Sequence, residues 1–143
     1  MFIGEFHHNL DNKGRLAIPA KFRKDLDDGA VITKGIEKCL VIFTKKGWES
    51  FAEKIKNLPI TKSDARAFNR SFFSGAAEVE VDIQGRILIP ENLRNFSSLN
   101  KKSVVVGLYD RIEIWEEGVW NEYKVKTEKN AVEIAEQLGD LGI

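Results

Sequence analysis

The sequence predicts an α+β domain with a mainly β core, built from two copies of one unit. The stretch DNKGRLAIP from Asp11 to Pro19 is written again as DIQGRILIP from Asp82 to Pro90. The content of 43% hydrophobic and 31% charged residues is that of a soluble globular protein. Each copy is too small to fold alone, so we expect the copies to interlock in one domain with internal pseudo-two-fold symmetry.

The repeat extends beyond the two short stretches. At an offset of 71 residues the aligned pairs are Asp11 with Asp82, Gly14 with Gly85, Arg15 with Arg86, Ile18 with Ile89, Pro19 with Pro90 and Arg23 with Arg94. After one inserted residue the pairs include Leu40 with Ile112, Phe43 with Trp115, Trp48 with Trp120 and Phe51 with Tyr123. The chain therefore contains a duplication of roughly 45 residues per copy, typical of repeat architectures.

Each copy begins with a predicted strand, a tight turn and a returning strand. Alternating apolar residues over 6–10 and 77–81 indicate half-buried strands. Asp at the first position and Gly at the fourth suit a hairpin turn, so Arg15 and Arg86 begin the returning strands. The apolar triplets 16–18 and 87–89 indicate strands covered on both faces, and the prolines that follow can start a short helix.

A second hairpin follows in each copy, formed by 31–33 with 40–43 and by 104–106 with 112–115. Helices are predicted over 46–57 and 63–73, with Ser63 as N-cap, and helical spacing continues over 119–138. Within a single domain 1–143 we expect a first unit at 5–47, a helical connection at 48–75, a second unit at 76–119 and a C-terminal helix and tail at 120–143.

Charge is distributed unevenly although the formal net charge is zero. Residues 1–75 carry 14 Lys/Arg and 9 Asp/Glu, whereas residues 110–143 carry 4 and 9. A basic first half can supply a local positive face, and solvated charge on unrelated surfaces is the alternative. No basic segment followed by an apolar one opens the sequence, and runs such as Leu40–Phe43 are far shorter than a membrane span, so we expect a cytoplasmic protein without a membrane partner.

The arginines of the repeated turns are the candidate binding residues. The planar guanidinium of Arg15 or Arg86 can meet two acceptors at once, on a phosphate or on the edge of guanine. The alternative is that Arg15 pairs with Asp11 and pins the turn; both roles can coexist, with Asp11 and Asp82 as supporting residues. Lys13, Lys21, Arg23 and Lys24 cluster around the first turn. Lys13, Lys21 and Arg23 are candidates for phosphate contacts, while a solvated helix face is the alternative for Lys21 and Lys24.

The sequence offers no pattern for catalysis, a metal or a cofactor. His7 and His8 are adjacent, but His8 aligns with Val79 and no further ligands have suitable spacing. Cys39 is the only cysteine, which excludes an intrachain disulfide, and it has no matched His-Asn/Asp arrangement. The aromatic pairs Trp48–Phe51 and Trp120–Tyr123 have helical spacing and favour core packing over base stacking. We expect no enzyme activity, no metal, no cofactor and no small-molecule substrate.

The two D-x-x-G-R motifs, each followed by an apolar triplet and Pro, together with the opening MFIGEFHHNLDNKGRLAIP, resemble the MraZ family of bacterial regulators over essentially the whole chain. The resemblance implies two AbrB/SpoVT-type swapped-hairpin units in an AbrB-like β-barrel with flanking helices. It implies a nucleoid-associated transcription factor that binds direct repeats in its own upstream DNA, at the division and cell-wall gene cluster, as a ring homo-oligomer. Arg15, Arg86, Asp11 and Asp82 match the family's DNA-binding positions. The alternative hypothesis is a protein-interaction scaffold in which the repeated turns mediate assembly.

Overall fold

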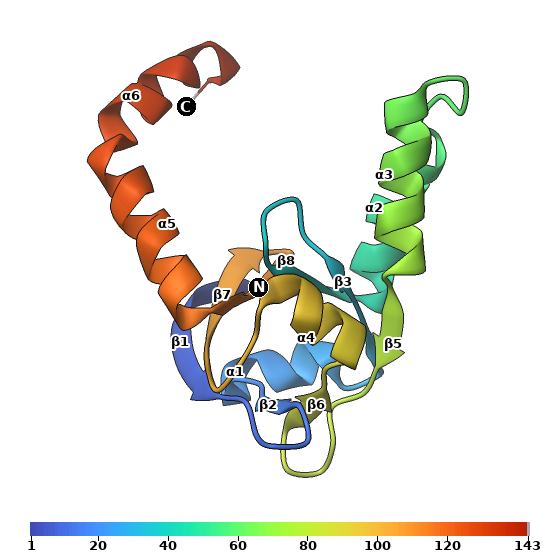
Figure 1. Ribbon diagram of the computed structural model, residues 1–143, viewed down its shortest axis with the longest axis vertical. Helices are drawn as coiled ribbons and strands as arrows, with labels where there is room; N and C mark the ends of the chain where they lie inside the picture. The colour runs from blue at the N-terminus through green and yellow to red at the C-terminus, as the bar shows by residue number, and fades with distance from the viewer. Residues whose placement is uncertain (143) are drawn as a thin grey trace.

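The computed structural model describes residues 1–142, which form an antiparallel six-stranded sheet, a separate two-stranded ribbon and helices around them (Figure 1). The strands are β1 (Phe2–Asn9), β2 (Arg15–Ala17), β3 (Ala30–Lys34), β4 (Leu40–Thr44), β5 (Ala77–Val79), β6 (Arg86–Leu88), β7 (Lys102–Tyr109) and β8 (Arg111–Glu116). The helices are α1 (Ala20–Arg23), α2 (Lys45–Lys56), α3 (Ser63–Ser74), α4 (Glu91–Ser97), α5 (Glu117–Lys129) and α6 (Ala131–Gln137), with 3₁₀ turns η1 (Lys24–Leu26) and η2 (Gly139–Leu141).

The large sheet contains interleaved strands of the two sequence copies. The large sheet has the order β1-β7-β8-β4-β3-β5, so the edge strand of each copy pairs with the other copy, and β4 pairs with β8 in the middle. Exchanging each strand for its counterpart reverses this order and leaves it otherwise unchanged. The mainly antiparallel α+β fold is thus confirmed, and the sheet has the pseudo-two-fold arrangement expected from the repeat.

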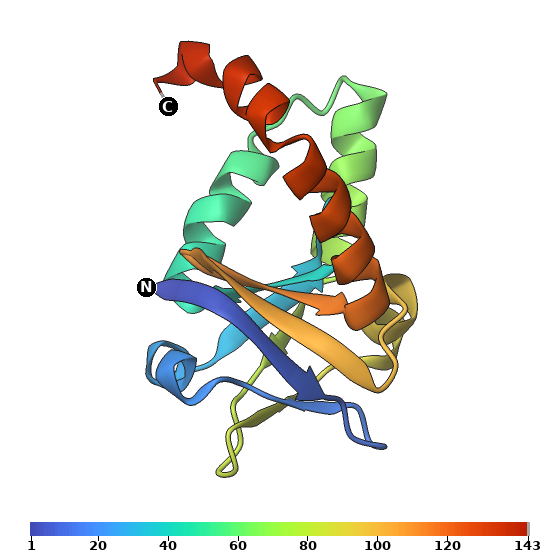
Figure 2. The ribbon, with the colours of Figure 1, turned by 90° about the vertical axis from the view of Figure 1, so that its left-hand side faces the viewer.

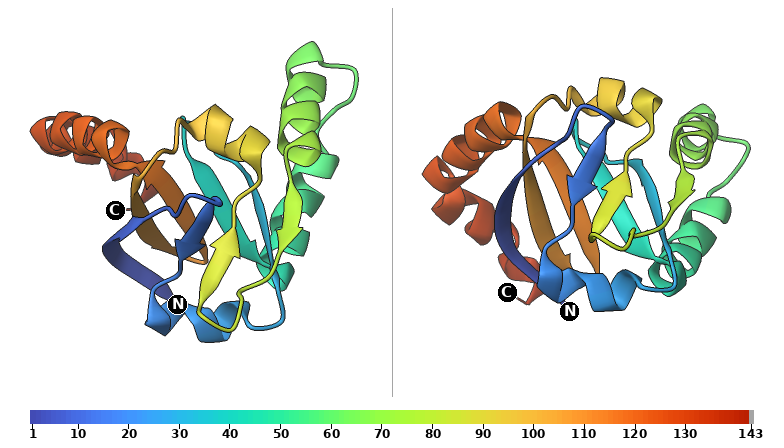
Figure 3. Two further views of the ribbon diagram at one scale, coloured as in Figure 1. Left: turned by 60° about the horizontal axis from the view of Figure 1, so that its bottom comes forward. Right: turned by 90° about the horizontal axis from the view of Figure 1, so that it is seen from below.

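The expected closed barrel is not present among residues 1–142. β1 and β5 remain the open edges of the large sheet, while β2 and β6 pair only with each other. The chain leaves each edge strand through a turn, and Leu10, the residue after β1, forms one isolated bridge with Leu16 of the ribbon. The ribbon therefore crosses one face of the sheet and does not extend it, as the views from the side and from below show (Figures 2 and 3).

The main core lies between that face of the sheet and the ribbon with α1 and α4. Its fully buried members include Leu16 and Ile18 of the first copy and Ile87 and Ile89 of the second, which are the predicted apolar triplets. Pro19 and Pro90 precede α1 and α4, as predicted. Burial on both sides of the ribbon explains why its strands read as continuous apolar runs.

Two smaller clusters cover the opposite face of the sheet. In one, rings of α2 and α3 pack on β4, with Trp48 and Phe72 stacked at 5.1 Å between ring centroids. In the other, Trp115 of β8 packs against Tyr123 of α5, also at 5.1 Å. The packing predicted for the helical aromatic pairs is confirmed for Trp48, Phe51 and Trp120, which are half-buried against these clusters, whereas Tyr123 is 39% exposed. α2–α3 and α5–α6 rise from opposite sides of this face (Figure 1).

Two details of the predicted helices are wrong. Lys62, not Ser63, occupies the N-cap of α3, and no side chain caps that helix end. The helical segment predicted over 119–138 breaks at Asn130, whose φ of −104° and ψ of 15° separate α5 from α6. Asn is unfavourable inside a helix because its side-chain amide can form hydrogen bonds with nearby backbone groups in non-helical conformations. This preference explains the break at Asn130.

Candidate nucleic-acid interface

Each repeated turn is organised by its aspartate. The Asp11 carboxylate accepts hydrogen bonds from the backbone N–H groups of Lys13 and Arg15, both at 2.9 Å, and from Arg15 Nε at 2.7 Å. These bonds, led by that from the Arg15 backbone N–H, lower the pKa of Asp11 to about 2. The carboxylate therefore stays ionised and holds both the turn and the guanidinium.

The second turn repeats this geometry. Asp82 accepts the Arg86 backbone N–H at 2.9 Å and Arg86 Nε at 3.0 Å, and the backbone bond is the main cause that lowers its pKa. The ion pair expected as an alternative for Arg15 is thus present in both copies. In each copy the side-chain hydrogen bond to the carboxylate of the same turn is made by Nε and not by a terminal nitrogen.

Antiparallel pairing of β2 with β6 places the two turns at opposite ends of the ribbon and brings Arg15 and Arg86 close to each other across it. Arg15 lies opposite Leu88 and Ala17 opposite Arg86 in the ribbon. Arg86 Nη1 lies 3.9 Å from Asp11 Oδ2, so an ion pair joins the turns of different copies. Side-chain exposures of 32% for Arg15 and 27% for Arg86 leave both guanidinium groups accessible to solvent. Both turns protrude at the end of the molecule away from α2 and α5, one at each end of the ribbon (Figure 2).

Arg23 and Arg94 form a second pair of arginines, and each lies against the turn of the other copy. A Cβ built on Gly14 would lie 2.7 Å from Arg94 Cζ, and one built on Gly85 would lie 2.2 Å from Arg23 Cζ. Arg23 Nε donates to the Ile18 carbonyl at 2.8 Å, and Arg94 Nε donates to the Ile89 carbonyl at 3.0 Å. Each turn is therefore completed by an arginine from the other copy.

Both turn glycines also have left-handed backbone conformations, with φ of +84° at Gly14 and +81° at Gly85. A side chain at either position would meet strained backbone and a guanidinium at once. This explains why the sequence keeps glycine at the fourth position of both motifs while the residues between Asp and Gly change.

The predicted site residues come together to different degrees. Arg15, Arg86, Asp11 and Asp82 share the paired turns, and Arg23 joins them through Gly85. Lys13 is exposed within the first turn, whereas the Lys21 ammonium lies over the Phe6 ring of β1, 5.1 Å from its centroid. Sequence reasoning left Arg94 out of the site, although its alignment with Arg23 was the signal that could have placed it there.

Four guanidinium groups and Lys13 surround two carboxylates, so the surface is positively charged. It is a convex pair of turns, and none of its residues lines the two hollows beside α2. Such a surface suits phosphate oxygens or base edges of an extended anionic partner better than a small enclosed ligand.

The histidines and the cysteine lie elsewhere. His7 bonds to Glu5 at 2.9 Å and to Glu117 at 3.2 Å, while burial, followed by the charge of Arg23, lowers the pKa of His8. Cys39 is buried, and burial raises the pKa of its thiol. Across residues 1–142, no three His, Cys, Asp or Glu side chains are grouped as metal ligands, and no helix is long and apolar enough to cross a membrane.

Comparison with known proteins agrees with the doubled architecture. A family profile described as "MraZ protein, putative antitoxin-like" matches the chain twice, over residues 1–71 and 72–140. The chain belongs to the MraZ family. It is also 50% identical over 141 residues to the "Transcriptional regulator MraZ" of Desulforamulus reducens, an alignment that covers 99% of both chains. The two family matches each contain one Asp-x-x-Gly-Arg turn, so the paired turns are contributed equally by both repeats of the family.

Proposed function

We propose that this protein is a sequence-specific DNA-binding regulator of transcription that recognises direct repeats in its own upstream DNA at the division and cell-wall gene cluster. The observation that carries the proposal is the exposed surface on which the two repeated turns present Arg15 and Arg86 beside Arg23 and Arg94. The name of the relative, a transcriptional regulator, supports the same function. The protein acts in the cytoplasm on the nucleoid, by binding and not by catalysis.

Each residue has a separate role in this proposal. Arg15 and Arg86 contact base edges or clamp phosphates with their terminal nitrogens, while Asp11 and Asp82 fix their direction through Nε. The other basic groups contact phosphates, since phosphate contacts position a protein on the duplex without reading sequence. We assign this second role to Lys13, Lys21, Arg23 and Arg94.

The neutral net charge of the chain is compatible with DNA binding if several copies act together. A ring homo-oligomer presents the paired turns repeatedly, and direct repeats about one helical turn apart can meet successive subunits. We assign the turns to swapped hairpins of the AbrB/SpoVT type. We further propose that 1–143 is one folding unit, with repeats at 5–47 and 76–119, a helical connection at 48–75 and a C-terminal segment at 120–143.

The test is Arg15→Ala, with Arg70→Ala as the matched control because it removes the same charge from exposed α3. Loss of a bidentate base contact costs roughly 1–3 kcal/mol, which is about a 5- to 150-fold loss of affinity. Fluorescence anisotropy with the protein's own upstream DNA and a scrambled duplex, at two salt concentrations, should show this loss for Arg15→Ala alone.

Unchanged affinity of the Arg15→Ala protein, with its fold and assembly intact, would remove Arg15 from the interface. Under the scaffold hypothesis the same substitution would dissociate the oligomer and leave the DNA affinity of each chain similar. Sedimentation velocity on the same samples therefore separates the two functions.

A further inference from the structure

The C-terminal arm, defined as α6 and η2 over residues 131–141, has no cover in its own chain. None of the residues of α6 is buried. Ile134, Leu138 and Leu141 recur at helical spacing on one side and are 41%, 38% and 74% exposed. A seven-residue helix is marginal in water without packing on an apolar face, so the arm has the properties of a segment that another surface covers.

A groove with an aromatic floor lies on the same face of the sheet, on the side away from the arm. Two hollows of about 500 and 380 Å³ share Phe43, Phe51 and Arg111 and so run together along the inner side of α2. The aromatic rings of α2 and α3 line its floor, and the lysines at its rim include Lys46 and Lys54. Neither of these two lysines forms an ion pair with any residue of the described chain, 1–142.

The acidic arm complements the two rim lysines, Lys46 and Lys54. The lining of the groove as a whole is balanced in charge, with Lys34, Lys46, Lys54 and Arg111 beside Asp25, Glu37, Asp110 and Glu113. Asp25 pairs with the Met1 amino group and Asp110 with Arg111, so these two carboxylates do not neutralise the rim lysines.

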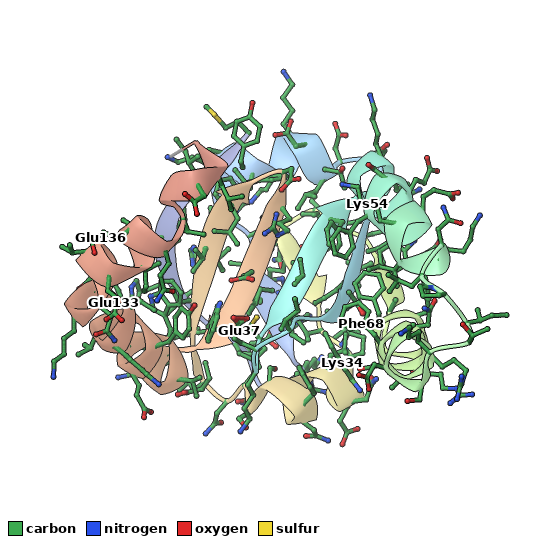
Figure 4. All side chains as sticks on the ribbon, turned by 90° about the horizontal axis from the view of Figure 1, so that it is seen from above. Lys34, Glu37, Lys54, Phe68, Glu133 and Glu136 are labelled. Carbon is green, nitrogen blue, oxygen red and sulfur yellow. The ribbon has the colours of Figure 1, made fainter. Side chains whose placement is uncertain are left out.

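The arm carries Glu133, Glu136 and Asp140 and no Lys or Arg, whereas α2, α3 and their connection, residues 45–74, carry seven Lys/Arg and three Asp/Glu. Figure 4 shows Glu133 and Glu136 on one side of the sheet face and Lys54 and Phe68 on the other. Within one chain the arm and the groove are therefore separated by the width of this face (Figures 1 and 4).

We propose that the C-terminal arm of one chain docks in the α2–α3 groove of a second copy, with Ile134 and Leu138 seated on the aromatic floor and the acidic side steered by the rim lysines. Pairing of two arms with each other is disfavoured, because it would oppose like charges. The contact joins different surfaces of the two copies, so repeated docking generates a ring if the rotation closes. This inference rests on the self-assembly contained in the proposed function and names the surfaces that make it.

The experiment compares full-length chains by sedimentation velocity without DNA. I134S/L138S removes two side chains from the apolar side of the arm, and V125S/V132S is the matched control because Val125 and Val132 are 68% and 74% exposed and Val132 lies on the other side of α6. The I134S/L138S chain should sediment as a 16.2 kDa monomer, with association weakened at least about tenfold per side chain, and the control should assemble like the wild type. Circular dichroism checks that each variant folds.

A charge-exchange pair tests which groove is used. Chains with E133K/E136K and chains with K46E/K54E should each associate poorly at low salt, and mixing them should restore assembly because the reversed charges again complement each other. Assembly of I134S/L138S like the wild type, a wild type that stays monomeric at every concentration, or no recovery on mixing would overturn the proposal. Anisotropy with a short single-site duplex measures DNA affinity separately, so failure of the docking inference is distinct from failure of the proposed function.

Discussion

Gly85→Ala tests whether Arg23 of the first repeat stabilises the turn of the second repeat. The alanine Cβ would lie 2.2 Å from Arg23 Cζ, in a residue with φ of +81°. The left-handed conformation costs an L-residue roughly 1–2 kcal/mol. Displacing the guanidinium breaks the 2.8 Å bond from Arg23 Nε to the Ile18 carbonyl, a net loss of roughly 0.5–1.5 kcal/mol.

Together these losses lower the free energy of unfolding by roughly 1.5–3.5 kcal/mol, or the melting temperature by about 3–14 °C for a domain of this size. Urea and thermal unfolding followed by circular dichroism measure both quantities. Gly139→Ala is the control, since no atom lies within 4 Å of a Cβ built there, and its effect should stay within about 0.5 kcal/mol.

A double-mutant cycle with Arg23→Ala isolates the contact. Without the guanidinium, Gly85→Ala should cost only the backbone part, so the two changes should be less than additive by roughly 0.5–1.5 kcal/mol. Additive effects would refute the reasoning, because they would mean that Arg23 does not rest on the turn of the other copy.

Three further predictions concern the turns, the core and cooperativity. The pKa of Asp11 in the folded protein is about 2, below the ordinary 3.8, so ionised Asp11 stabilises the fold above about pH 4 and this stabilisation is lost as the pH falls towards 2. The difference in urea midpoint between wild type and Asp11→Asn should shrink over that interval. A constant difference would contradict this prediction. Phe72→Ala should cost roughly 3–5 kcal/mol in urea unfolding, and Phe73→Ala, at a 36% exposed position, less than half of that; equal costs would argue against the aromatic cluster as a core. Tryptophan fluorescence and circular dichroism should report one coincident unfolding transition, because the sheet contains strands of both repeats; two separate transitions would show independent halves.

Local chemistry in the sequence was sufficient to predict most elements. The Asp-x-x-Gly pattern placed both turns, the apolar triplets placed β2 and β6, and the prolines placed the starts of α1 and α4. The internal repeat was the strongest signal, because an error in one copy would have been visible as a mismatch with the other. Ser63 and Asn130 show the limit of this reasoning, since a helix end within a few residues depends on tertiary contacts as well as on capping preferences.

Long-range geometry could not be predicted in the same way. The pattern of alternating residues does not predict that β2 pairs with β6 or that β1 and β5 each keep one unpaired edge. The barrel suggested by family resemblance was therefore wrong. The crossing of Arg94 over Gly14 depends on that pairing, and Arg94 was therefore missed as a member of the site. Register and pairing partners are set by the packing of the whole core, which a single sequence does not display.

Contacts between the two repeats limit how the residues of the turns can change. Arg86 is 3.9 Å from Asp11, Arg23 covers Gly85 and Arg94 covers Gly14, so each turn depends on side chains of both repeats. A substitution in one repeat therefore alters the binding surface of the other, and the two turns cannot be tuned independently as they could in two separate domains. This coupling offers a physical reason why both repeats keep Asp, Gly and Arg at equivalent positions while Asn12-Lys13 and Ile83-Gln84, which face solvent, have diverged.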